Sequence, residues 1–157
     1  MMTKLRIGVP IFLLAGLLGC KHSDTTTAPG AIASVAIDSP STVQSGQSFT
    51  IDVSAVNVGI NNVHNGRVEV TLPAPLQVTS VGASVGTSAT FSNSAGATVV
   101  WTLNTLDSNS QSRLHIGTTG TLAPGSPAQT LPLHATMTAD GIGPGQAVAQ
   151  ATVQLTP

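Results

Sequence analysis

Apolar and polar residues alternate with a period of two over most of the chain beyond residue 30. Alternation of this kind is typical of a β-strand with one face buried and the other in water. The pattern is clearest in residues 49–55, 68–72, 131–139 and 149–155. Shorter segments of the same kind are residues 34–38, 76–81, 99–103 and 114–121. We therefore expect a strand in each of these segments.

The expected strands are short and are separated by turn-forming residues. No segment beyond Cys20 keeps a helical period, and Gly, Pro or Asn recurs about every 8–12 residues. Short strands with regular turns are typical of two packed antiparallel sheets. The pattern predicts an all-β domain over residues 31–157, an antiparallel immunoglobulin-like β-sandwich of about 7–9 strands. A β-barrel is the main alternative.

The apolar positions of the strands predict a single core. Trp101 shares a strand face with Val99 and Leu103, so we expect it at the centre of that core. The residues expected to form the core are Phe49, Ile51, Val53, Val70, Leu72, Trp101, Leu133 and Val153.

Two Gly-containing dipeptides predict turns. Asn65-Gly66 precedes the strand at Arg67 and is typical of a tight turn. Asp140-Gly141 opens a glycine-rich stretch, residues 141–145, which we expect to be a loop between the last two strands.

The first residues have the organisation of an export signal. Lys4 and Arg6 precede an apolar run over residues 7–18, which is shorter than the roughly 20 residues a membrane-spanning helix needs. This pattern predicts a signal-peptide helix within residues 1–19. Residues 20–30 are rich in Ser, Thr and Pro and predict a flexible tether. Fully extended, the ten residues 21–30 would reach about 35 Å.

Leu17, Leu18 and Gly19, followed by Cys20, resemble the lipobox of bacterial lipoproteins. The resemblance implies that the chain is cut before Cys20 and lipidated there, which would anchor it in a membrane of the cell envelope. Lys21 after the cysteine then implies the outer membrane if the organism is Gram-negative. The alternative is an ordinary secretory leader followed by a chance cysteine. Cys20 is the only cysteine in the chain, so it has no disulfide partner within the molecule.

Charged residues make up only 7% of the chain. Beyond Cys20 the basic residues are Lys21, Arg67 and Arg113. Nucleic-acid binding depends on clustered Lys and Arg, so isolated arginines exclude nucleic acid as a partner. The lipobox resemblance predicts the membrane as a partner, through a lipid on Cys20. The other expected partner is a protein at the cell envelope.

Few residues suggest chemistry. Ser84 lies in a G-x-S-x-G match over residues 82–86, but a nucleophile elbow needs a helix after the serine and none is expected. His115 and His134 alternate with apolar residues and should face outward. In a hairpin of their two strands they would lie about four residues apart, too far to share a metal unless the register shifts. We predict no catalytic residue, no metal site and no cofactor, and thus no enzyme.

Several landmarks between Gln44 and Leu122 occur in a recognisable order. They are Ser45-Gly46-Gln47, Asn57 and Gly59 in an N-x-G arrangement, Leu72-Pro73, and Val100-Trp101-Thr102-Leu103. In these features the segment resembles the conserved-repeat domain of bacterial surface proteins, number eleven in the series of domains of unknown function. The resemblance implies an immunoglobulin-like surface domain with a structural or adhesive role. Some related surface domains carry a Lys–Asn isopeptide bond, which is excluded here because no lysine lies beyond position 21.

The sequence thus favours a lipid-anchored cell-envelope protein with a non-catalytic structural or adhesive β-sandwich. The alternative is a cohesin-like or carbohydrate-binding-like module that recognises a protein or a glycan. Such modules commonly present aromatic rings to sugars or a shaped sheet face to a dockerin partner. The chain has no tyrosine, and with Phe49 and Trp101 expected in the core only Phe91 remains. An aromatic sugar platform is therefore not expected, and contact with a protein through a flat polar face of Thr, Ser and Gln stays open.

Overall fold

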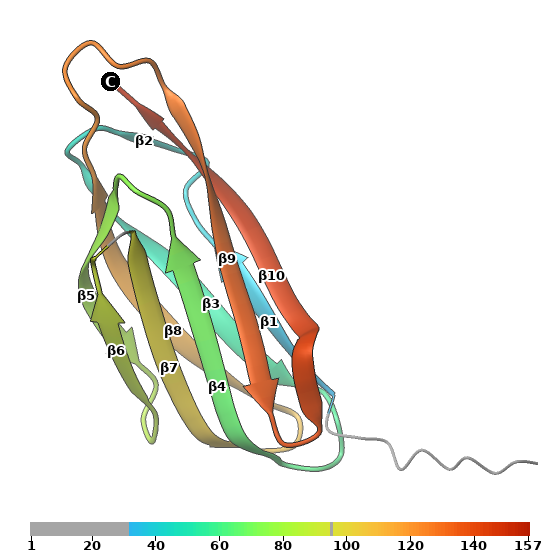
Figure 1. The fold of residues 1–157 in the computed structure, drawn as a ribbon. Coiled ribbons are helices and arrows are strands. Elements are labelled where there is room, and N and C mark those ends of the chain that lie inside the picture. The colour runs from blue at the N-terminus through green and yellow to red at the C-terminus, as the bar shows by residue number, and fades with distance from the viewer. Residues whose placement is uncertain (1–31, 95) are drawn as a thin grey trace, which may run out of the picture.

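The computed structural model describes residues 32–94 and 96–157, which form ten strands. Figure 1 shows them as two layers whose strands run along one long axis. The strands are β1 (Ala33–Asp38), β2 (Thr42–Gln44), β3 (Ser48–Asn57), β4 (Val63–Leu72), β5 (Leu76–Ala83), β6 (Ser88–Ser92), β7 (Ala97–Leu106), β8 (Ser110–Gly120), β9 (Gln129–Ala139) and β10 (Ile142–Thr156). The leader, the lipobox and the tether lie outside the described residues.

The strands divide into a four-stranded and a six-stranded sheet. The order in the first is β1-β3-β8-β5, and in the second it is β2-β10-β9-β4-β7-β6. Neighbouring strands are antiparallel except β2 and β10, which are parallel. Two separate sheets confirm the predicted sandwich, and the barrel alternative is wrong.

The structure contains two strands that the alternation did not predict, β2 and β6. β2 has three residues, and β6 is exposed or half-buried at all five of its positions. Both lie at edges of the six-stranded sheet. An edge strand buries little side-chain surface, so its sequence needs no strong apolar period.

A single core fills the space between the sheets. Seven of the eight residues expected there are at most 1% exposed: Ile51, Val53, Val70, Leu72, Trp101, Leu133 and Val153. The eighth, Phe49, is only partly buried, which corrects the sequence prediction. β1 pairs with β3 only as far as Asp38 opposite Asp52, so no β1 residue covers β3 beside Phe49.

The structure corrects the prediction at each of the two Gly-containing dipeptides. Asn65 and Gly66 lie inside β4, at a bulge where the pairing with β7 shifts and Asn65 has a φ of +54°. A side chain at Gly66 would meet Leu103 at 3.0 Å, so this glycine permits the close approach of β7. Asp140-Gly141 does form a turn, but β10 begins immediately at Ile142. The glycine-rich stretch is therefore a bulged start of β10, with a register shift between Ile142 and Ala147, and not a loop.

Candidate functional site

Ser84, the serine of the G-x-S-x-G match, holds the end of β5 to β8. Its Oγ donates to the backbone oxygen of Arg113 at 2.9 Å and accepts from the Arg113 N–H at 2.8 Å. The next residues form a turn into β6 and not a helix. The Ser84 backbone N–H also donates to the Arg113 oxygen at 2.9 Å, so the hydroxyl reinforces this backbone contact, and the geometry of a nucleophile elbow is not present.

The histidines His115 and His134 lie on different sheets. β8 belongs to the four-stranded sheet and β9 to the six-stranded sheet. The hairpin of these two strands that the sequence suggested therefore does not form. Residues 121–128 carry the chain from one sheet to the other. His115 instead pairs with Asp52 directly opposite it on β3, and both side chains are half exposed. Within residues 32–94 and 96–157, no group of three or more Asp, Glu, His or Cys side chains could hold a metal ion.

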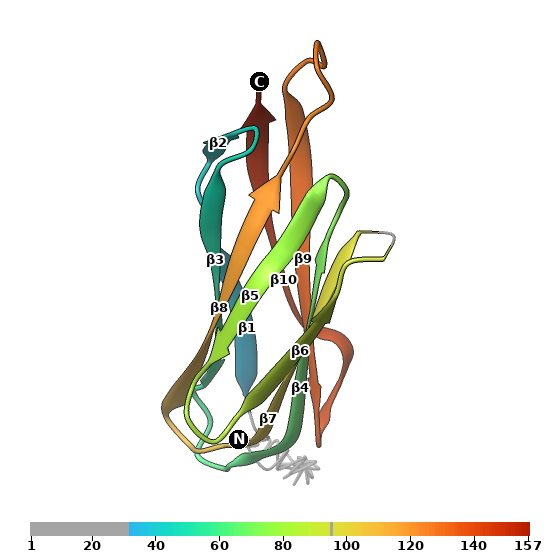
Figure 2. The same ribbon diagram turned by 90° about the vertical axis from the view of Figure 1, so that its left-hand side faces the viewer.

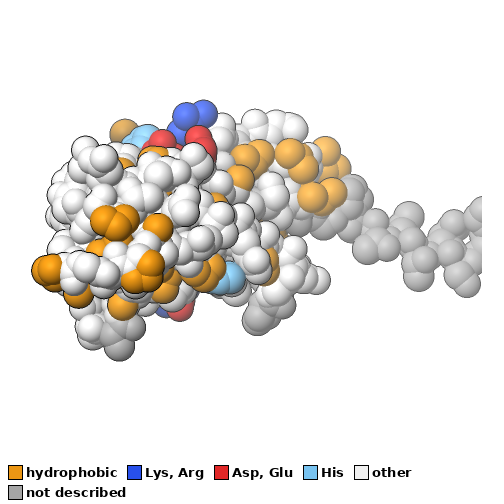
Figure 3. All heavy atoms as spheres, turned by 90° about the horizontal axis from the view of Figure 1, so that it is seen from above, with side chains coloured by type: hydrophobic (Ala, Val, Ile, Leu, Met, Phe, Trp, Pro, Cys, Tyr) orange, Lys and Arg blue, Asp and Glu red, His pale blue; other side chains and the backbone are white. Residues whose placement is uncertain are grey.

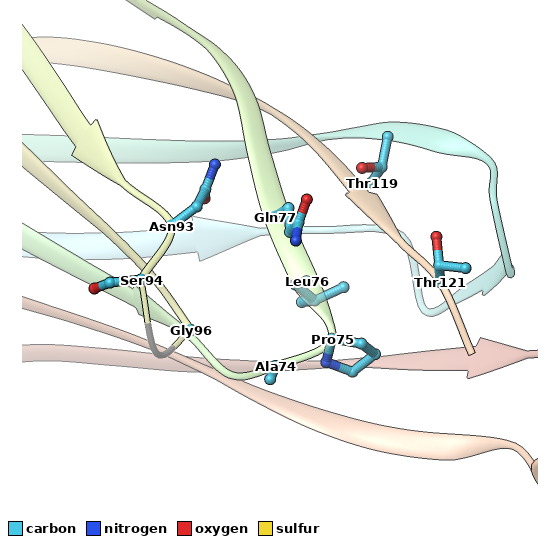
Figure 4. A pocket seen from close by; sticks show the side chains of 9 residues that line it. All are labelled: Ala74, Pro75, Leu76, Gln77, Asn93, Ser94, Gly96, Thr119 and Thr121. Atoms are coloured by element: carbon cyan, nitrogen blue, oxygen red, sulfur yellow. The ribbon is translucent and has the colours of Figure 1, made fainter. Parts of the chain in front are cut away.

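A shallow hollow of about 230 Å³ lies between the start of β5 and the loop that joins β6 to β7. Figure 4 shows Asn93 and Ser94 on one side of it, Thr119 and Thr121 on the other, and Pro75 between them. The Asn93 amide is committed to the protein, since it accepts from the Val78 N–H at 2.9 Å and donates to the Val78 oxygen at 2.8 Å. No lining residue is titratable, so this hollow offers no acid, base or charged ligand group.

The outer faces of both sheets carry charged side chains, and on the six-stranded sheet these include Arg67 and Glu69, which pair at 3.2 Å. On the four-stranded sheet, Asp38, Asp52 and His115 form one cross-strand row, which we call the charged row and which ends opposite Gly82 of β5. Figure 3, which looks along the sandwich, shows most of the visible charged side chains along one side. The six-stranded sheet carries a threonine face, formed by Thr42, Thr71, Thr90, Thr98, Thr102, Thr130, Thr136, Thr138, Thr152 and Thr156, which alternate with inward-facing residues. Both faces are largely polar and offer hydrogen-bonding surfaces.

One end of the sandwich, which we call the tether end, differs from the other. It comprises the chain entry at Ile32 and the loops at residues 58–62, 84–87, 107–109 and 140–141. Figure 2 shows the described chain entering at this end, whereas the C-terminus lies at the opposite end. The backbone N–H of Val58 donates to the oxygen of Ile32 at 3.0 Å, which ties the entry to the loop after β3.

Asn57 organises the tether end. Its side chain is fully buried, and its Nδ2 contacts the backbone oxygens of Asn61, Leu106 and Asp107 at 2.8–3.1 Å. Its Oδ1 accepts from the Gly59 N–H at 2.9 Å. The amide thereby joins the loop after β3 to the loop after β7. The sequence identified the N-x-G arrangement only as a landmark, because the partners of Asn57 lie about 50 residues away.

Phe91, the aromatic residue expected outside the core, lies on the edge strand β6 and is 42% exposed. It pairs with the buried Val99 and so faces the core side of the sheet. It stands alone as an exposed aromatic side chain among the described residues. An aromatic platform for stacking sugars is therefore not formed there.

No protein-family model matches the chain, and no curated protein matches its sequence. The resemblance of residues 44–122 to the conserved-repeat surface domain therefore stays a prediction.

Solved structures do share the fold. The CARDB domain of a Pyrococcus furiosus protein, crystallised with di-metal ions, superposes with a TM-score of 0.57 at 16% identity, over 80% of this chain and 89% of that one. A cohesin module from a Clostridium perfringens family 33 glycoside hydrolase superposes with a TM-score of 0.59 at 12% identity, over 80% of this chain and 98% of that one. A non-cellulosomal cohesin from Archaeoglobus fulgidus superposes with a TM-score of 0.56 at 13% identity, over 81% of this chain and 93% of that one. These likenesses and the sheet order define an immunoglobulin-like β-sandwich domain.

Proposed function

We propose that this protein is a lipid-anchored component of a bacterial cell envelope whose β-sandwich makes structural or adhesive contacts and is not catalytic. The observation that carries the proposal is the place of the only cysteine. Cys20 ends an apolar leader and precedes the first described residue, Ile32, by 12 positions. Several acyl chains on one residue would hold the protein firmly, because each buried methylene contributes about 0.8 kcal/mol.

The surface of the domain supports a role in contact and not in chemistry. Ser84 is committed to the backbone of Arg113, and the hollow beside Asn93 carries no titratable side chain. The threonine face extends across the six-stranded sheet and is partly or fully exposed, as suits binding to another surface. In a Gram-negative cell, Lys21 favours the outer membrane.

Replacing Cys20 with alanine should abolish lipidation. In cells fed a radioactive fatty acid, we expect label on the wild-type protein and none on Cys20→Ala, which should accumulate with its leader attached. Ser84→Ala is the matched control and should be labelled like the wild type. An unlabelled wild-type protein in cells that lipidate other proteins would refute the anchor.

A second candidate is a cohesin-like module that recognises a protein through one sheet face. The similarity of the fold to two cohesins favours this candidate. The four-stranded sheet is the face to test, because Gly82 lies opposite His115 at the end of the charged row. A Cβ at Gly82 would meet no atom within 4 Å, and the position is exposed, so a side chain there starts into open space.

Gly82→Arg is expected to reduce capture of an envelope partner by this face at least about tenfold, since a protruding cation beside His115 prevents close approach of the partner. Thr136→Arg, on the outer face of the six-stranded sheet, is the matched control and should retain binding. The measurement is recovery of cross-linked partners from envelope fractions. Equal recovery with both variants would exclude the four-stranded face.

A further inference from the structure

Exposed apolar side chains gather at the tether end. Six large hydrophobic residues are exposed in the described chain, and four of them belong to this end: Ile32, Val58, Ile60 and Val85, at 56%, 59%, 69% and 103% exposure. The other two, Phe91 and Val148, lie within strands. Because loop tips are usually polar, this concentration of apolar side chains suggests a surface that contacts something apolar.

The four residues lie along one end of the four-stranded sheet. Ile32 precedes β1, Val58 and Ile60 follow β3, and Val85 follows β5, so they extend from one edge of that sheet to the other. The bonds of Asn57 hold the loop that carries Val58 and Ile60. These two side chains are thus presented on an ordered loop, and no other part of the described domain covers them.

On the proposed anchor, the position of Cys20 in the sequence favours a membrane as the surface that these side chains contact. Ile32 lies twelve positions beyond Cys20, a distance of at most about 43 Å when the chain is extended. A lipid on Cys20 would therefore keep the tether end close to the bilayer at a high effective concentration. Contacts too weak to recruit a free protein are sufficient under that condition. On the proposed lipid anchor, we infer that the tether end rests on the bilayer and inserts these four side chains shallowly among the lipids.

The charges at this end define the kind of lipid surface. Its loops contain Asp107 and Asp140 and no Lys or Arg. Docking of this surface is apolar, so it needs no anionic lipid and does not weaken with added salt. Phosphatidylcholine vesicles are therefore the appropriate probe surface.

Lipidation uses the only thiol of the chain, so an introduced cysteine can be labelled alone. The mature lipoprotein, with its lipid verified by mass, is placed in phosphatidylcholine vesicles that contain a lipid spin-labelled high on its acyl chain. A fluorophore is attached at Ile60→Cys or, as the matched control, at Ala123→Cys in the loop between β8 and β9 at the opposite end. We expect about two- to threefold greater quenching at position 60, because interfacial insertion reaches only the upper acyl region.

A second variant separates docking from anchoring. With the fluorophore at Val85→Cys, the change Ile60→Asp should abolish quenching while the protein stays bound to the vesicles through its lipid. Since Ile60 is exposed, the melting temperature should not change. Equal quenching at positions 60 and 123 in a verified lipoprotein would overturn the docking and leave the anchor standing. Quenching at position 60 that appears only in native envelope membranes would assign the surface to a protein, and an unlipidated Cys20 would end both proposals.

Discussion

Trp101→Ala is expected to destabilise the domain by about 3–5 kcal/mol, which is a large part of the stability of a typical domain. Trp101 is fully buried on β7, between β4 and β6, and is the largest of the fully buried side chains. Its removal leaves a cavity that the flanking strands cannot close, because their positions are set by the sheet. It also removes the donor of a 3.0 Å hydrogen bond from Nε1 to the Thr87 Oγ1.

The measurement is urea unfolding followed by circular dichroism, because the variant loses the only tryptophan of the chain. Phe91→Ala is the matched control, since it removes an aromatic side chain from the neighbouring strand β6. That side chain is already 42% exposed, so we expect a loss of only about 1 kcal/mol. Similar losses in the two variants would contradict a core centred on Trp101.

Asn57→Leu is expected to destabilise the domain by about 2–4 kcal/mol, although leucine branches at the same atom and is more apolar. The substitution deprives the backbone oxygens of Leu106 and Asp107 of the amide donor and leaves the Gly59 N–H without its acceptor. A buried polar group without a partner costs more than the apolar side chain contributes. The loops at residues 58–62 and 107–109 should then exchange their amide hydrogens faster, because Asn57 is the buried side chain that joins them.

The matched control is Asn62→Ala in the same loop. The Asn62 Oδ1 accepts one exposed hydrogen bond, from the Ser108 N–H at 3.0 Å, so its loss should cost less than about 1 kcal/mol. Asn57→Asp is a second informative variant because it keeps the acceptor and loses the donor. If Asn57→Asp were as stable as the wild type, the three backbone oxygens would not depend on the amide.

The alternation predicted the central strands well because the direction of a side chain in a strand depends only on its parity. Ile51 and Val53 point inward wherever β3 lies in the molecule, so their burial is a local property. Phe49 has the same parity and is nevertheless half-buried, since the extent of β1 beside it decides its cover. Parity indicates which face a residue occupies but not whether another strand reaches it.

Other features depend on contacts between distant segments. The bulge at Asn65-Gly66 has the local sequence of a turn, but pairing with both β7 and β9 continues β4 past it. β8 and β9 follow one another in sequence and still belong to different sheets. The bonds from Asn57 to the loop after β7 depend on the tertiary structure, which places that loop beside the loop after β3.

The sequence by itself determined the all-β class, the inward face of the central strands and the single core, because these follow from a period of two and from Gly and Pro between the strands. It also contains the leader and the lone cysteine on which the anchoring proposal depends. Only the tertiary structure decided the order of strands in the two sheets and the gathering of Ile32, Val58, Ile60 and Val85 at the end where the chain enters. These features arise when segments far apart in the chain pair, and local residue patterns do not encode which segments will meet.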